Sequence, residues 1–170
     1  MINIKNSLLL IIILVFTQCI KDQKETLMWS VESNKYNSPQ ILTESISKDS
    51  INLELMGLVS CRDLKDIILK GGEGNLNDST KCNIRSVNVY NLSDREISVY
   101  QVDLEDLVNG RYIQLMFTIE YGAILKEYLD VRMSLLEKDS SEDCKAKLKE
   151  LINKVLSDTA LYPSLPKITL

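Results

Sequence analysis

Residues 111–121 read RYIQLMFTIEY, the most regular pattern in the 170-residue chain. The odd positions of this run hold Ile113, Leu115, Phe117, Ile119 and Tyr121. Its even positions are mainly polar, with Gln114 and Glu120 among them. Because successive side chains of a strand point to opposite faces, this alternation predicts a β-strand that buries one face.

Two further strands are expected before this one, over residues 84–92 and 97–104. The polar run SDRE at 93–96 separates them, and Asn109 with Gly110 marks the turn into the last strand. Short turns of this kind join antiparallel neighbours. The three segments therefore predict an antiparallel meander.

A possible fourth strand lies earlier in the chain, where Ile51, Leu53 and Leu55 alternate with polar residues. Met56 breaks this alternation, so a helix that starts near Ser50 is the alternative. Whether it is a strand or a helix, the segment carries an apolar face that has to pack against the rest of the protein. We therefore place the start of the folded domain at residue 50.

A short helix is expected after Ser60. Ser60 and Asp63 match a capping box, whose side chains satisfy unpaired amides of the first turn, and Gly71 can end the helix in a left-handed conformation. The glycine-rich run that follows, residues 71–78, lacks the Lys-Ser/Thr ending of a phosphate-binding loop. We expect a mobile surface loop there.

Two more helices are expected after the meander, over residues 123–138 and 140–155. The apolar residues in helical register are Ile124, Tyr128, Val131 and Leu135 in the first, and Cys144, Leu148, Leu151, Ile152 and Val155 in the second. Ser140 or Ser141 can cap the second helix. The predicted fold class is therefore α+β: a three-stranded antiparallel meander, with a possible fourth strand, packed against two to three helices.

Composition excludes several functions. The chain has no histidine, which removes catalytic triads built on histidine and the commonest metal ligand. Its 24 acidic and 20 basic residues give a net charge of −4, and no basic stripe marks a nucleic-acid interface. We therefore expect no enzyme activity, no cofactor and no nucleic-acid partner.

Two local patterns are candidate sites of chemistry. The oxygen-bearing residues near one strand end are Asp103, Glu105, Asp106 and Asn109. Their spacing fits no calcium loop, so a solvated turn is the favoured interpretation and no metal site is predicted. Ser45 and Lys48 match the S-x-x-K of serine enzymes, but the partner motifs of those enzymes do not occur, so the match is attributed to chance.

The N-terminus carries an export signal. Nine large apolar residues run from Leu8 to Phe16, after Lys5, which is too short to cross a bilayer but fits a signal peptide. No pair of small residues supplies an ordinary cleavage site. The run ends instead in Phe16-Thr17-Gln18-Cys19, which resembles the lipobox of bacterial lipoprotein precursors, although Gln18 stands where that family has a small residue.

The resemblance covers only this N-terminal segment, and it implies a signal peptide over residues 1–18 and lipidation of Cys19. An uncleaved N-terminal anchor and cleavage at another site are the alternatives. Residues 19–49 are mostly polar and are interpreted as a tether, followed by a single domain over residues 50–170. Ile20 after the cysteine implies no inner-membrane retention signal.

The remaining cysteines are Cys61, Cys82 and Cys144, and no pair has the C-x-x-C spacing of a zinc or redox site. An exported chain meets an oxidising compartment, where disulfides form. We favour a bridge between Cys61 and Cys82, because it would clamp the glycine-rich loop, while the other pairings remain open.

The expected function is a lipid-anchored, non-catalytic cell-envelope protein that binds an envelope or secreted protein, facing the periplasm or the cell exterior. An immunity protein or inhibitor and an envelope accessory are both compatible with this class. The alternative is a small-ligand or lipid binder, which requires an apolar cavity of roughly 300 Å³ or more. An enzyme that uses carboxylates alone is a third hypothesis and needs two of them to converge in a cleft.

Overall fold

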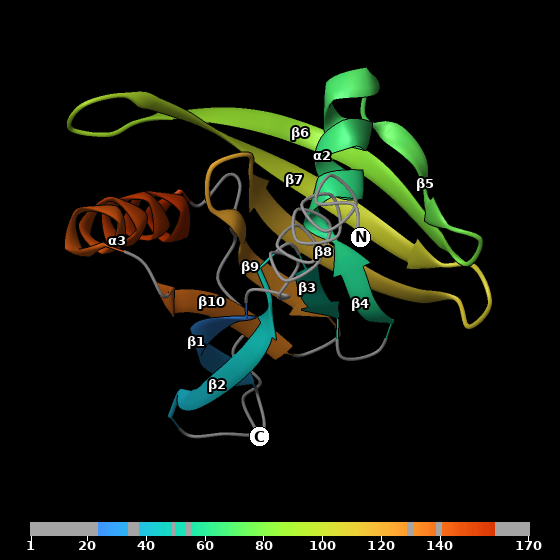
Figure 1. Ribbon diagram of the computed structural model, residues 1–170, viewed down its shortest axis with the longest axis horizontal. Coiled ribbons are helices and arrows are strands. Elements are labelled where there is room, and N and C mark those ends of the chain that lie inside the picture. Colours follow the sequence, from blue (N-terminus) through green and yellow to red (C-terminus); the bar gives the residue numbers. More distant parts are fainter. Residues whose placement is uncertain are drawn as a thin grey trace, which may run out of the picture.

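The computed structural model describes residues 24–33, 38–48, 50–53, 56–128, 131–138 and 141–158 (Figure 1). These residues form ten strands and two helices in the order β1 (Lys24–Ser33), β2 (Gln40–Ser47), β3 (Ser50–Leu53), β4 (Gly57–Ser60), α2 (Cys61–Lys70), β5 (Glu73–Asn77), β6 (Thr80–Asn91), β7 (Glu96–Asp106), β8 (Arg111–Thr118), β9 (Gly122–Tyr128), β10 (Val131–Lys138) and α3 (Glu142–Ser157).

Eight of the strands form one antiparallel sheet in the order β2-β1-β10-β9-β8-β7-β6-β5, and β3 pairs with β4 in a separate hairpin. The expected meander is present as β6, β7 and β8. The predicted fold class is wrong, because the sheet has eight strands and only two helices accompany it in the described part of the chain.

The largest correction concerns residues 123–138, which were expected to be helical and instead form β9 and β10. Four consecutive residues of β9, from Ala123 to Lys126, are all buried. Both faces of these strands are covered at this point, so the polar and apolar alternation that identifies a strand disappears. The helical spacing of the apolar residues in this segment is therefore a coincidence.

The prediction of a tether over residues 19–49 is also corrected. Within this range β1 begins at Lys24 and β2 at Gln40, and both strands belong to the main sheet. The buried side of β1 carries Leu27 and Trp29 together with a charged residue, Glu25. Glu25 is buried because it forms an ion pair of 3.1 Å with Lys138. This buried charge made the segment look solvent-exposed in the sequence.

The loop expected over residues 71–78 contains β5, which pairs with β6 at the edge of the sheet. Its glycines permit close packing. A Cβ atom at Gly74 would lie 3.3 Å from Cγ1 of Ile67 in α2, and one at Gly72 would lie 3.0 Å from Cδ1 of Ile84. Gly72 also has a φ of +86°, which side chains disfavour.

Both helices that the capping residues predicted are confirmed. The Ser60 side chain accepts a hydrogen bond from the Asp63 amide, and Gly71 ends α2 with a φ of +125°. Ser141 caps α3 by accepting a hydrogen bond from the Cys144 amide. Neither described helix combines the length and the hydropathy that a bilayer crossing demands.

The two faces of the sheet carry different layers. The Nζ atom of Lys126 in β9 donates to the Asn52 carbonyl oxygen of β3 at 3.1 Å, so the β3–β4 hairpin covers this face together with α2. The next residue, Glu127, points to the opposite face, where it lies across from Gln114 of β8. That second face carries α3 at one end (Figure 1).

Ion pairs attach α3 to the sheet. Lys145 pairs with Glu137 of β10 at 2.7 Å, and Lys147 pairs with Asp94 of the β6–β7 turn at 2.7 Å. The apolar side of the helix is buried, as the sequence predicted, through Leu148, Leu151, Ile152 and Val155. Beyond α3, no other described element covers the second face.

Candidate functional site

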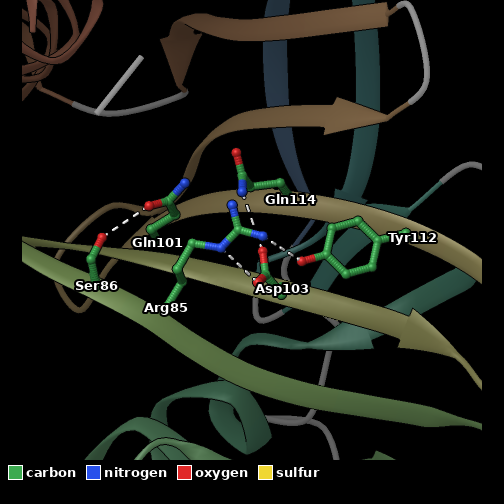
Figure 2. Close-up of polar contacts among 6 residues, drawn as sticks. All are labelled: Arg85, Ser86, Gln101, Asp103, Tyr112 and Gln114. Carbon is green, nitrogen blue, oxygen red and sulfur yellow. Dashed lines mark hydrogen bonds and ion pairs between the residues drawn. The ribbon is translucent and has the colours of Figure 1, made fainter. Parts of the chain in front are cut away.

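The uncovered part of the second face carries a group of polar side chains, which we call the polar face: Arg85, Ser86, Gln101, Asp103, Tyr112 and Gln114. They come from β6, β7 and β8, the three strands of the meander (Figure 2). Asp103 lies directly across from Gln114 in the β7–β8 ladder. These side chains are joined to one another by hydrogen bonds rather than left to move independently.

Asp103 is the centre of this network. Its Oδ2 accepts a hydrogen bond of 3.0 Å from Nε of Arg85, and its Oδ1 accepts one of 3.2 Å from Nε2 of Gln114. The Nη2 atom of Arg85 donates to the Tyr112 hydroxyl at 3.0 Å. Hydrogen bonds to ionised groups are stronger than neutral ones, so the four side chains hold each other in place.

A β-bulge puts Arg85 in this position. The β6–β7 register shifts between Ile84 and Ser86, so Arg85 has no residue directly across from it in β7. Bulges bend a strand and redirect a side chain. On the far side of the bulge, the Ser86 hydroxyl donates to Oε1 of Gln101 at 2.9 Å (Figure 2).

Burial raises the pKa of the Tyr112 hydroxyl, and the neighbouring negative charge of Asp103 raises it further. Tyr112 therefore stays neutral and available as a hydrogen-bond partner at physiological pH. Its side chain is nevertheless 46% exposed. A rigid, half-exposed tyrosine offers a partner both a ring face and a hydroxyl at little cost in entropy.

The polar face continues across the sheet. Gln114 lies opposite Glu127 in β9, which in turn lies opposite Arg132 in β10 and pairs with it at 3.5 Å. Towards the hairpin tips a shallow groove of about 150 Å³ is lined by Lys81, Asn83, Asp103, Glu105 and Tyr112. Positive and negative groups thus alternate along the row, in which the Arg132 side chain is buried.

The charged groups of this arrangement are engaged with their neighbours. Both oxygens of the Asp103 carboxylate already accept hydrogen bonds. The acidic residues that the sequence placed at one strand end do not converge, because Asp106 points to the other face, where it caps its own turn by accepting from the Val108 and Asn109 amides. Among the described residues no group of three acidic or thiol side chains is placed to hold a metal ion.

The sequence-predicted site residues lie elsewhere. Cys19 and the signal peptide are outside the described residues. Cys61 begins α2, whereas Cys82 lies near the start of β6 opposite Leu104, and no disulfide joins the described cysteines. The bridge expected between Cys61 and Cys82 is therefore not formed in the structure. It was inferred from a flexible loop, and that segment is strand β5, which places Gly74 across from Cys82.

The Cys82 thiol is expected to resist alkylation. Burial raises the pKa of Cys82 to about 11, with a further contribution from the charge of Asp103, and the thiolate is the reactive form. With iodoacetamide at pH 8, Cys82 should react far more slowly than the half-buried Cys144, and unfolding in urea should remove the difference. Site-resolved mass spectrometry measures both rates, and equal rates in the folded protein would contradict the prediction.

The sequence did not identify the residues of the polar face as a site. Gln114 was recognised only as one of the polar positions of an alternating strand, and polar strand positions usually face solvent. The one available signal was the run of hydrogen-bonding side chains at alternate positions of consecutive predicted strands. The bulge that directs Arg85 to Asp103 has no signature in the sequence.

The cavities are relevant to the alternative function, the binding of a small ligand or lipid. The most enclosed one has a volume of about 20 Å³, room for one water molecule, and lies between β1, β3 and α2 with Glu25 and Lys138 in its wall. The other grooves described here are open and range from about 150 to 240 Å³. None of these, within the described part of the chain, is an enclosed apolar space of the size that a ligand-binding function requires.

Comparison with known proteins identifies no relative. The chain matches no protein-family model, and searches against curated proteins and against solved structures gave no match either.

Proposed function

We propose that this chain is a non-catalytic lipoprotein of the cell envelope that binds another protein through its polar face. The observation that carries the proposal is the hydrogen-bonded network around Asp103 on the part of the second sheet face that α3 does not cover. Pre-organised side chains lose little entropy on binding, which favours recognition. The groups of this network already satisfy one another, so none is left as a free base or nucleophile.

The chemistry of the face favours a protein as the partner. Arg85 lies beside Asp103, and Lys81 and Glu105 line the groove next to them, so the surface offers no field of a single sign to a phosphate backbone. Arginine and tyrosine are the residues enriched at protein interfaces. Both forms of the function, an immunity-type inhibitor and an envelope accessory, use such a surface.

The anchor is tested by replacing Cys19 with alanine and labelling cells with palmitate. We expect the label to disappear and the protein to leave the membrane fraction, because the acyl chains replace the signal peptide as the anchor. Cys144→Ala is the matched control and should keep the label. Label that persists on the Cys19→Ala variant would remove the lipoprotein part of the proposal.

Binding is tested by placing a photo-reactive phenylalanine analogue at Tyr112 in the full chain and irradiating intact cells. We expect an adduct of one discrete mass, which an added Arg85→Ala substitution should weaken because it removes a cation of the polar face and the hydrogen bond that orders Asp103. The same analogue at Asp66, on the exposed side of α2, is the control. Adducts that are equal at both positions, or absent at Tyr112, would contradict binding through the polar face.

A further inference from the structure

The two outer strands of the sheet differ in what covers them. One outer strand, β5, lies under α2, which packs so closely that a Cβ atom at Gly74 would lie 3.3 Å from the Ile67 side chain. The other, β2, pairs with β1 on one side and with no described strand of the sheet on the other. An open strand edge presents backbone amides and carbonyls that another strand can bind.

The sequence of β2, QILTESIS, lacks the devices that usually protect an edge. It contains no lysine and no proline. Its one charged residue, Glu44, is turned inward, where it accepts from Nε1 of Trp29 at 2.9 Å and pairs with Lys126 at 3.4 Å. Ile41 is 61% exposed and Leu42 is 36% exposed. Because they are neighbours, they present aliphatic surface on both faces of the edge.

A groove lies beside the same edge. It has a volume of about 230 Å³ and is lined by Thr43 of β2 together with Thr26, Met28, Glu137 and Lys145. Thr43 is two residues from Ile41, so the groove and the exposed Ile41 side chain lie on the same face. One edge therefore carries both a protruding aliphatic side chain and a hollow large enough to take one.

We propose that two copies of the chain associate through β2, antiparallel about a two-fold axis with Leu42 facing Leu42. In this register Ile41 of each copy faces Thr43 of the other and lies over its groove. Gln40 faces Glu44, so no like charges are opposed. A two-fold interface requires a surface that is complementary to itself, and this combination of side chain and groove meets that requirement.

The proposal is independent of the proposed function, because the polar face lies on β6, β7 and β8 and the dimer edge on β2. It is tested with Leu42→Cys in the purified full chain, treated with a mild thiol oxidant and analysed without reductant, so that the result does not depend on the compartment of the protein. Directly opposed strand residues lie within the Cα separation that a disulfide spans. We expect a covalent dimer whose bridge mass spectrometry maps to position 42 in both copies.

Two further variants make the test specific. Adding Ile41→Lys should reduce the covalent dimer by about tenfold or more, because a charged side chain would have to give up its hydration to enter the groove that the aliphatic one fills. The control is Leu69→Cys, since Leu69 is 75% exposed on the helix α2 and belongs to no strand edge. It should give no dimer, and equal bridging at positions 42 and 69 would overturn the proposal.

Hydrogen exchange of the unmodified full chain separates the remaining outcomes. In the dimer, the outward amides of β2 should be protected and should lose protection in Ile41→Lys. A protein that gives no bridge and exchanges these amides rapidly overturns the proposal. So does a monomer whose β2 amides are protected, because the edge is then covered by the chain's own residues.

Discussion

Lys126→Met is expected to lower the free energy of unfolding by about 3–5 kcal/mol, the usual cost of removing one partner of a buried ion pair. Lys126 is almost fully buried. Its Nζ atom pairs with Glu44 at 3.4 Å, donates to the Asn52 carbonyl oxygen at 3.1 Å and lies 4.2 Å from the centre of the Trp29 ring. Methionine fills the same space but leaves the Glu44 carboxylate without a counter-charge.

The measurement is urea unfolding followed by circular dichroism. The double variant with Glu44→Gln should recover part of the loss, because the unpaired buried charge is then gone. Glu73→Gln is the control, since it breaks the exposed ion pair with Lys81 and should leave the unfolding midpoint almost unchanged. A midpoint of Lys126→Met that matches this control would show that the buried pair does not hold β2, β3 and β9 together.

Trp29→Ala is expected to cost a similar amount, about 3–5 kcal/mol, through the cavity that it leaves. The side chain is 1% exposed, and its Nε1 atom donates to Glu44 at 2.9 Å. The indole ring also supports the Lys126 ammonium group, so its removal loosens the whole charged cluster. Trp29→Phe keeps an aromatic ring and should cost less, with the lost hydrogen bond as its main penalty.

Far-UV circular dichroism serves for this series because the variants lack the only tryptophan. Leu69→Ala provides the control, since Leu69 on α2 is exposed and its truncation should change stability by less than about 0.5 kcal/mol. If Trp29→Ala and Leu69→Ala unfolded at the same urea concentration, β1 would not be a structural strand. The tether that the sequence suggested for this region would then be the better description.

The elements predicted correctly are those whose signals are local. Ser60 with Gly71 defined α2, Ser141 defined the start of α3, and the alternation in residues 111–121 identified β8. Caps and alternation depend on a few neighbouring residues and survive in any tertiary context. They identify an element but not the number of strands that will join it.

The strands that escaped prediction are those whose burial depends on distant partners. Leu125 and Lys126 are buried on opposite faces of β9 by layers that come from other parts of the chain. Glu25 in β1 is buried only because Lys138 neutralises it. No periodicity within one segment records such partners, so a central strand resembled a helix and an outer hairpin resembled a tether.

The candidate site was hidden for a related reason. Asp103 was weighed with Glu105, Asp106 and Asn109 because they are close in sequence, but its partners in space come from the two adjoining strands. Arg85 is 18 residues from Asp103 in sequence, and Gln114 is 11 residues from it. Proximity in sequence indicates a shared site on a loop, whereas on a sheet the relevant neighbours are set by the register of the strands.

The pairing of β1 with β10 affects the order in which the protein can be completed. Leu27 pairs with Lys138, so nearly the whole described chain has to leave the ribosome before this pair can form. Sheets that join distant segments fold slowly, because the entropy of closing the long loop is lost before the contacts are gained. Until then the hairpin of β1 and β2 has no place in the sheet, and a chain shortened before Val131 would expose Trp29 permanently to the quality-control proteases of the cell.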